Sequence, residues 1–147
     1  INSNFHGIFI WTLSITEIDI FENYGGKKGK GIHRQTQSVH YGVSGKSTRG
    51  FIARGAKTCK TRDTGFHIYA CEWTPTFIKF YTDGKIIRYQ RINKKLRAWL
   101  NEEMTIIINN GLEPKYLPTN ESSYPTNFLM VDWIRVWQKN ESLNNKK

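Results

Sequence analysis

The stretch FIKFYTDGKIIRYQ (residues 77–90) decides the fold class of this chain. Two runs rich in β-branched and aromatic residues flank the dipeptide Asp83-Gly84, which readily takes the positive φ angles of a two-residue type I′ turn. A third run of the same character, GFHIYACEW (65–73), comes just before. The sequence therefore predicts an antiparallel β-hairpin at this point.

Strand signals continue on both sides of the hairpin, whereas helix signals are poor. We expect further strands over residues 6–13, 16–22, 36–43, 104–110 and 128–138 and one short helix over 94–103. Many short strands separated by loop signals are typical of an all-β, antiparallel β-sandwich. Tryptophans in such sandwiches are mostly core residues, and we expect this of Trp73, Trp133 and Trp137.

Length and composition indicate one globular unit. The chain has 147 residues, of which 38% are hydrophobic and 14% aromatic, so it can bury a core. No apolar run reaches the ~18 residues that a membrane span needs, so we expect no membrane partner. We expect a domain over residues 1–138 and a polar basic tail over 139–147.

The formal net charge of +10 raises the alternative of a nucleic-acid or polyanion binder. Ile, Asn and Lys together make up 43 of the 147 residues, and their codons are A/T-rich, so composition bias also explains the lysines. The aromatic residues lie in the predicted strands and not among the basic residues. We therefore expect no nucleic-acid partner, while an anionic polysaccharide stays open.

The segment TEIDIFENYG (16–25) breaks the alternation of a strand. Glu17 and Asp19 share one face of an extended chain, but Glu22 arrives one position late. A β-bulge at Ile20–Phe21 would return Glu22 to the face of the other two acids, and bulges are common beside active sites. The sequence thus predicts three carboxylates on one face of one strand.

Three adjacent carboxylates have a chemical use. Like charges at short range raise the pKa of at least one group, so that one acid holds a proton near neutral pH. Glycosidases need such a pair, one carboxylate and one carboxylic acid, about 5–5.5 Å apart when the mechanism retains configuration. The alternative is an ordinary solvated acid face of an antiparallel sheet.

Four stretches together resemble glycoside hydrolase family 16, the laminarinase, agarase and carrageenase family. EIDIFE is similar to the catalytic signature of the members that carry a bulge, and GIFIWTL (7–13) resembles the strand leading into it. FHIYACEWTPTFIKFYTDGKIIR (66–88) and FLMVDWIRVWQ (128–138) resemble the family's hairpin and closing strand. The stretches follow the family order over residues 5–138. The resemblance implies a concanavalin A-like jelly roll.

The resemblance also implies a reaction, which is retaining hydrolysis of an internal β-glycosidic bond. Glu17 is similar to the nucleophile and Glu22 to the acid/base. Asp19 is similar to the aspartate between them, which would orient Glu17 and help to keep the proton on Glu22. The expected substrate is a β-1,3 or β-1,3-1,4-glucan. Alternatives are a sulfated galactan, because of the basic loops, and a lectin-like sandwich that binds polysaccharide without cleaving it.

Other residues are expected around such a site. Candidates for substrate binding are Trp11, Tyr24, His40 and Trp99. Asp132 resembles a family position that helps to bind a structural calcium, and the reaction requires no cofactor. Because the family's substrates are extracellular, the resemblance implies a secreted, periplasmic or cell-surface protein.

Two features depart from the family pattern or stay open. Glu17 comes almost at the start of the chain, whereas several strands precede it in the family, so we expect a jelly roll that lacks its first strands. The two cysteines, Cys59 and Cys71, are too few for a disulfide scaffold or a zinc site. Cys71 lies in an apolar run and is expected to be buried, and a bridge to Cys59 is left open.

Overall fold

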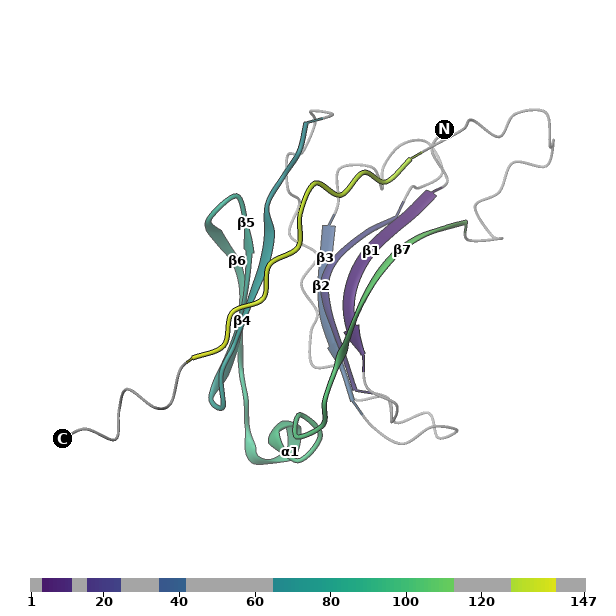
Figure 1. Ribbon diagram of the computed structural model, residues 1–147. Coiled ribbons are helices and arrows are strands. Elements are labelled where there is room, and N and C mark those ends of the chain that lie inside the picture. The colour runs from purple at the N-terminus through teal and green to yellow at the C-terminus, as the bar shows by residue number, and fades with distance from the viewer. Residues whose placement is uncertain (1–3, 12–15, 25–34, 42–64, 113–127, 140–147) are drawn as a thin grey trace.

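The computed structural model describes residues 4–11, 16–24, 35–41, 65–112 and 128–139, and it forms two antiparallel sheets that face each other (Figure 1). The first sheet has the order β3-β2-β1-β7 and the second β4-β5-β6. The strands are β1 (Asn4–Trp11), β2 (Glu17–Tyr24), β3 (Gln35–His40), β4 (Tyr69–Trp73), β5 (Phe77–Thr82), β6 (Lys85–Arg91) and β7 (Thr105–Leu112). The predicted all-β antiparallel sandwich of jelly-roll type is confirmed.

The turn between β5 and β6 is the predicted one. Asp83 and Gly84 have φ angles of 50° and 74°, and Thr82 pairs with Lys85 on either side of them. The Asp83 carboxylate accepts a hydrogen bond from the backbone N–H of Ile68 at 3.0 Å. This bond ties the turn to the segment that leads into β4.

The predicted helix over 94–103 is shorter in the structure. Helix α1 covers only Lys94–Arg97, and its N-cap Asn93 accepts from the Leu96 N–H at 2.9 Å. Beyond Arg97 the chain continues in tight turns, with Trp99 N–H donating to Leu96 O at 3.0 Å. Leu96 and Leu100 are both buried in this region. Among the described residues, no helix has the length and apolarity to cross a bilayer.

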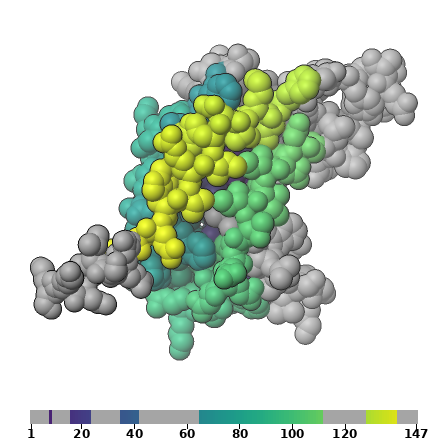
Figure 2. Space-filling view, in the orientation of Figure 1, coloured from purple at the N-terminus to yellow at the C-terminus, as the bar shows by residue number. Residues whose placement is uncertain are grey.

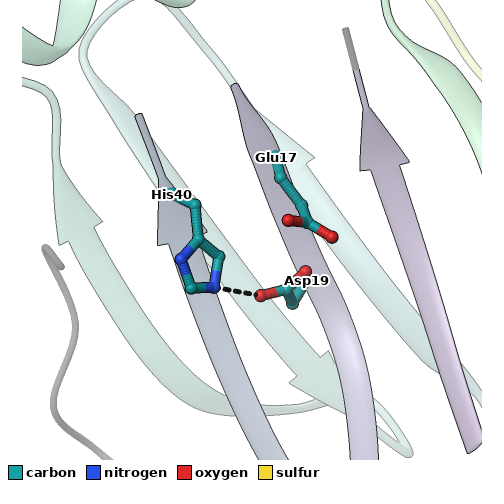
Figure 3. Close-up of side chains that lie close together, drawn as sticks. All are labelled: Glu17, Asp19 and His40. Atoms are coloured by element: carbon teal, nitrogen blue, oxygen red, sulfur yellow. Dashed lines mark ion pairs between the residues drawn. The ribbon is translucent and has the colours of Figure 1, made fainter. Parts of the chain in front are cut away.

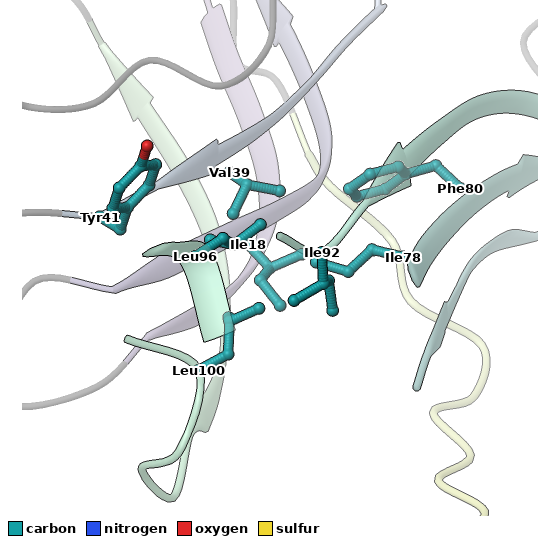
Figure 4. Packing of buried hydrophobic residues seen from close by; sticks show 8 residues of the cluster. All are labelled: Ile18, Val39, Tyr41, Ile78, Phe80, Ile92, Leu96 and Leu100. Atoms are coloured by element: carbon teal, nitrogen blue, oxygen red, sulfur yellow. The ribbon is translucent and has the colours of Figure 1, made fainter. Parts of the chain in front are cut away.

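The core draws residues from both sheets, from Leu96 of α1 and from Leu100 just after it (Figure 4). Its fully buried side chains include Ile18 from β2 and Phe80 from β5. The rings of Phe21 and Tyr69, one from each sheet, lie 4.0 Å apart between their centroids. The buried hydrophobic cluster consists of Ile18, Val39, Tyr41, Ile78, Phe80, Ile92, Leu96 and Leu100.

The strand predicted over 128–138 does not form. Within the described part of the chain this segment joins neither sheet, and it runs across the side of the sandwich between β4 and β7 (Figures 1 and 2). The prediction of core positions for Trp73, Trp133 and Trp137 is wrong, because they are 39%, 44% and 76% exposed. Trp73 lies on β4, at the edge of its sheet, and the segment that carries the other two pairs with none of the described strands.

Truncation of a core side chain is expected to lower the stability of the fold. Phe80→Ala is expected to lower the free energy of unfolding by about 3–5 kcal/mol, because it leaves a cavity between the sheets. Urea denaturation measures this loss. Phe77→Ala, on the half-buried outer face of the same strand, is the matched control and should cost clearly less. Equal losses for the two variants would contradict the assignment of faces.

Candidate active site

A bulge in β2 brings the acidic residues into phase. Against β1, Ile8 pairs with Phe21 and the next residue, Phe9, pairs with Asp19. Ile20 of β2 therefore has no paired residue on β1. Against β3, Asp19 pairs with Ser38 and Glu22 pairs with Thr36, which again leaves an extra residue on β2. The bulge predicted at Ile20–Phe21 is therefore confirmed.

The two faces of β2 lie in different surroundings. Ile18 and Phe21 are buried and belong to the side that faces the second sheet. Asp19 and Glu22 are only 1% and 8% exposed, and Glu17 is partly buried. The acids therefore sit in a poorly hydrated environment, where their charges interact more strongly than they would in open water.

Asp19 is paired with a histidine from the neighbouring strand. His40 lies opposite Glu17 in the register of β2 and β3, and its Nε2 is 2.8 Å from Asp19 Oδ2 (Figure 3). Ligand atoms of Glu17, Asp19 and His40 all lie within 4.8 Å of one another. Strand pairing thus places one imidazole beside two carboxylates. The imidazolium form can neutralise Asp19.

The electrostatics of this group act chiefly on Glu17. Burial, together with the nearby charge of Asp19, raises the pKa of Glu17 to about 7, while His40 opposes the shift. The hydrogen bond with Asp19 raises the pKa of His40 from its ordinary value, against the effect of burial. Near neutral pH, Glu17 therefore exchanges a proton readily. The raised pKa thus falls on Glu17, which resembles the nucleophile, and burial is the largest single contribution to it, ahead of the neighbouring acids. The expectation that the proton stays on Glu22 remains a prediction.

Glu22 is held by hydroxyl groups of β3, which the sequence alone did not single out. Thr36 Oγ1 donates to Glu22 Oε2 at 3.1 Å, and Ser38 Oγ donates to the same oxygen at 3.4 Å. The signal that could have identified them is the alternation of Thr36, Ser38 and His40 in the strand that follows the acids. Each of these residues faces β2 with a polar group.

One group of described residues has the side-chain types that bind metal ions. Glu17, Asp19 and His40 could hold a cation by their atom types, and they form the only such group of three in the described part of the chain. Asp132 is exposed and has no comparable group around it there. Calcium binding at Asp132 therefore remains a prediction.

The predicted substrate-binding residues are placed in different ways. The backbone of Trp11 pairs with Glu17, and that of Tyr24 with Phe5, but the side chains of Trp11 and Tyr24 lie outside the description. Trp99 packs against the core, and its backbone oxygen accepts from Thr16 Oγ1 at 3.0 Å. His40 alone is seen beside the acids. Their roles toward substrate stay predictions.

The cysteine prediction is confirmed in one part. Cys71 is a free thiol packed against the core, and burial raises its pKa to about 12. It packs as a small, partly buried hydrophobic residue. Cys59 lies outside the described residues, as do all of residues 25–34 and 42–64, where basic loops are predicted.

The raised pKa of Glu17 predicts a pH-dependent effect on stability. Its folded-state pKa of about 7 exceeds the ordinary value of 4.5, so between these pH values the folded form binds more protons than the unfolded form. The free energy of unfolding therefore falls as the pH rises from about 4.5 to 7. Glu17→Gln removes this titration. We expect the free energy of unfolding of the variant to exceed that of wild type by an amount that grows from about pH 4.5 to 7. The difference should persist at pH 8.

Urea denaturation at a series of pH values measures that gain. Glu72→Gln is the matched control, because Glu72 is exposed and hydrogen bonds from Tyr81 and Lys79 lower its pKa instead. It should show no gain at high pH. A gain for Glu17→Gln that is the same at pH 4 and pH 8 would rule out the proposed titration.

Comparisons with known proteins agree with this arrangement. The model of glycosyl hydrolases family 16 matches residues 9–135. A beta-glucanase of Rhodothermus marinus is 27% identical over 140 residues, which cover 83% of this chain and 44% of that protein. Beta-agarase A from Zobellia galactanivorans superposes with a TM-score of 0.54 at 23% identity, over 74% of this chain and 45% of the agarase.

A structure of beta-agarase A in complex with oligoagarose gives a TM-score of 0.53 at 22% identity, again over 74% of this chain and 45% of the agarase. At this identity the structural matches show the fold alone. The chain spans less than half the length of these relatives. The family model, by contrast, matches most of the chain and includes the acidic strand β2. The chain belongs to glycosyl hydrolases family 16.

Proposed function

We propose that this chain carries the catalytic strand of a retaining endo-β-glycan hydrolase that cleaves β-1,3 or β-1,3-1,4-glucan. The observation that carries the proposal is the bulged strand β2, which gathers Glu17, Asp19 and Glu22 on one face. Family membership supports the reaction class. The Rhodothermus marinus beta-glucanase supports a glucan as substrate.

The proposed reaction is a double displacement. The Glu17 carboxylate attacks the anomeric carbon while Glu22 donates its proton to the leaving glycosidic oxygen, and a glycosyl ester forms on Glu17. Water then attacks the same carbon, Glu22 takes the proton of that water, and the ester bond to Glu17 breaks. The sugar is released with its configuration retained, and both carboxyl groups return to their starting states.

Asp19 and His40 have supporting roles in this proposal. Burial raises the pKa of Glu17 most, the charge of Asp19 raises it further, and the imidazolium of His40 acts in the opposite sense. Glu17 must be ionised to attack. The two neighbours therefore set the pH above which the nucleophile is available.

The choice between glucan and galactan is open to a direct assay. Beta-agarase A shares the fold, and one of its structures contains oligoagarose, so a galactan is the second candidate. Reducing-end release by the purified protein on laminarin, lichenan, agarose and carrageenan separates the candidates. We expect release from laminarin or lichenan. Binding without release from any of the four would favour a lectin-like function instead.

The proposed substrates are polysaccharides outside the cell. We therefore propose that the protein acts in a secreted, periplasmic or cell-surface setting, with no cofactor in the reaction itself. Fractionation of the native source, with detection by antibody, tests the location.

Substitution of Asp19 is expected to shift the pH dependence of kcat/KM. In Asp19→Asn the negative neighbour of Glu17 is lost, so the pKa of Glu17 falls and the acidic limb of kcat/KM moves to lower pH than about 7. His40→Gln removes the positive neighbour and should move the limb in the opposite direction. The pH dependence of kcat/KM measures both shifts. Movement of both variants in one direction would contradict the assigned charges.

A further inference from the structure

Strand β3 presents a row of polar side chains to the acids of β2. In the strand register Thr36 lies opposite Glu22, Ser38 opposite Asp19, and His40 opposite Glu17. Of the intervening residues of β3, Val39 belongs to the hydrophobic core and Gln37 is also buried. The strand therefore contributes one whole face to the site, and the roles of its two hydroxyl residues are not explained by the core.

Both hydroxyls converge on a single oxygen. Thr36 Oγ1 and Ser38 Oγ donate to Glu22 Oε2 at 3.1 and 3.4 Å, respectively. The bulge makes this possible, because it brings Glu22 opposite Thr36 with Ser38 one step along the same face. Glu22 is only 8% exposed and Ser38 only 7%. Bulk water is therefore poorly placed to replace either donor.

This geometry distinguishes the two oxygens of Glu22. A neutral carboxyl group has one hydroxyl oxygen and one carbonyl oxygen, and the carbonyl oxygen is the better acceptor. An oxygen that receives two hydrogen bonds therefore takes the carbonyl role, which leaves the proton on Oε1. When Oε1 gives up its proton, the same two donors stabilise the negative charge that spreads onto Oε2.

We propose that Thr36 and Ser38 are positioning residues that hold the Glu22 carboxyl so that Oε1 carries and recovers the transferred proton. The proposal rests on the proposed function, since it needs Glu22 to be the acid/base. The proton passes from Oε1 to the glycosidic oxygen as the bond from the anomeric carbon to that oxygen breaks. In the second step Oε1 takes a proton from the attacking water.

The test uses substrates that differ in their need for a proton donor. Aryl β-glycosides of the cleaved glycan can carry a poor leaving group, which needs protonation, or 2,4-dinitrophenolate, which does not. For Thr36→Val and Ser38→Ala we expect kcat/KM to fall about 10-fold or more on the poor leaving group and to change little on the activated one. Thr36→Ser keeps the hydroxyl and should restore most of the loss.

The controls separate positioning from general damage to the fold. Thr82 lies on β5 in the other sheet, and its buried hydroxyl accepts from Gln35 of β3 without a hydrogen bond to the acids, so Thr82→Val should have an equal effect on both substrates. Equal losses on both substrates for Thr36→Val and Ser38→Ala, or no loss at all, would overturn the proposal. If Glu22→Gln itself shows no dependence on the leaving group, the proposed function fails as well. The two failures are thus distinguishable.

Discussion

Glu17→Gln is expected to lower kcat on the glycan substrate by about 10⁴-fold or more, as removal of a covalent nucleophile does in other enzymes. The amide has nearly the shape of the carboxyl group but cannot form the glycosyl ester. Because the raised pKa of Glu17 reflects burial beside Asp19, the substitution also removes an unfavourable charge. The variant should therefore be folded and inactive.

Reducing-end release measures this loss, and the urea midpoint at pH 8 verifies the fold. Glu72→Gln is the matched control, since it makes the same chemical change on an exposed residue of β4 in the other sheet. It should keep activity within about twofold, as surface substitutions usually do. A Glu17→Gln variant that keeps a tenth or more of wild-type activity would exclude Glu17 as the nucleophile.

Glu22→Gln is expected to lower kcat/KM on the polysaccharide by about 10²–10⁴-fold, which is the usual contribution of a general acid. The loss should be much smaller on a dinitrophenyl glycoside, because that leaving group departs without protonation. Breakdown of the ester on Glu17 still needs a base, so a burst of dinitrophenol should precede a slow steady state.

Stopped-flow absorbance at the dinitrophenolate band records the burst and the steady state together. Wild type should show a smaller burst or none, since its second step is faster. A Glu22→Gln variant that is slowed equally on activated and unactivated substrates would place the acid/base at another residue. This result would leave the nucleophile assignment untouched.

Local sequence patterns were sufficient for the hairpin and the bulge. Few dipeptides adopt two positive φ angles at low cost, and Asp-Gly is one of them. Asp83 and Gly84 therefore indicated the turn, and both have positive φ in the structure. The late position of Glu22 predicted an extra residue on β2, because side chains in a strand alternate with a period of two. Both features are determined within a few residues of sequence, so they could be read without the fold.

Features that depend on tertiary packing could not be read in this way. The pKa of Glu17 depends on how deeply β2 is buried and on where His40 lies, and the hydroxyl contacts of Glu22 depend on the register with β3. The apolar run 128–138 has the composition of a core strand, but composition does not supply a partner strand. Its tryptophans are therefore exposed in the described structure.

Azide rescue tests the central claim, that Glu17 and Glu22 are a nucleophile and acid/base pair, most directly. Glu17→Gly and Glu22→Gly are each incubated with a dinitrophenyl β-glycoside and azide, and NMR of the anomeric proton gives the configuration of the glycosyl azide. Azide that takes the place of the nucleophile forms the α product, whereas azide that attacks the ester on Glu17 forms the β product. We predict α from Glu17→Gly and β from Glu22→Gly. The reverse pattern, the same anomer from both, or no azide adduct from either would contradict the assignment.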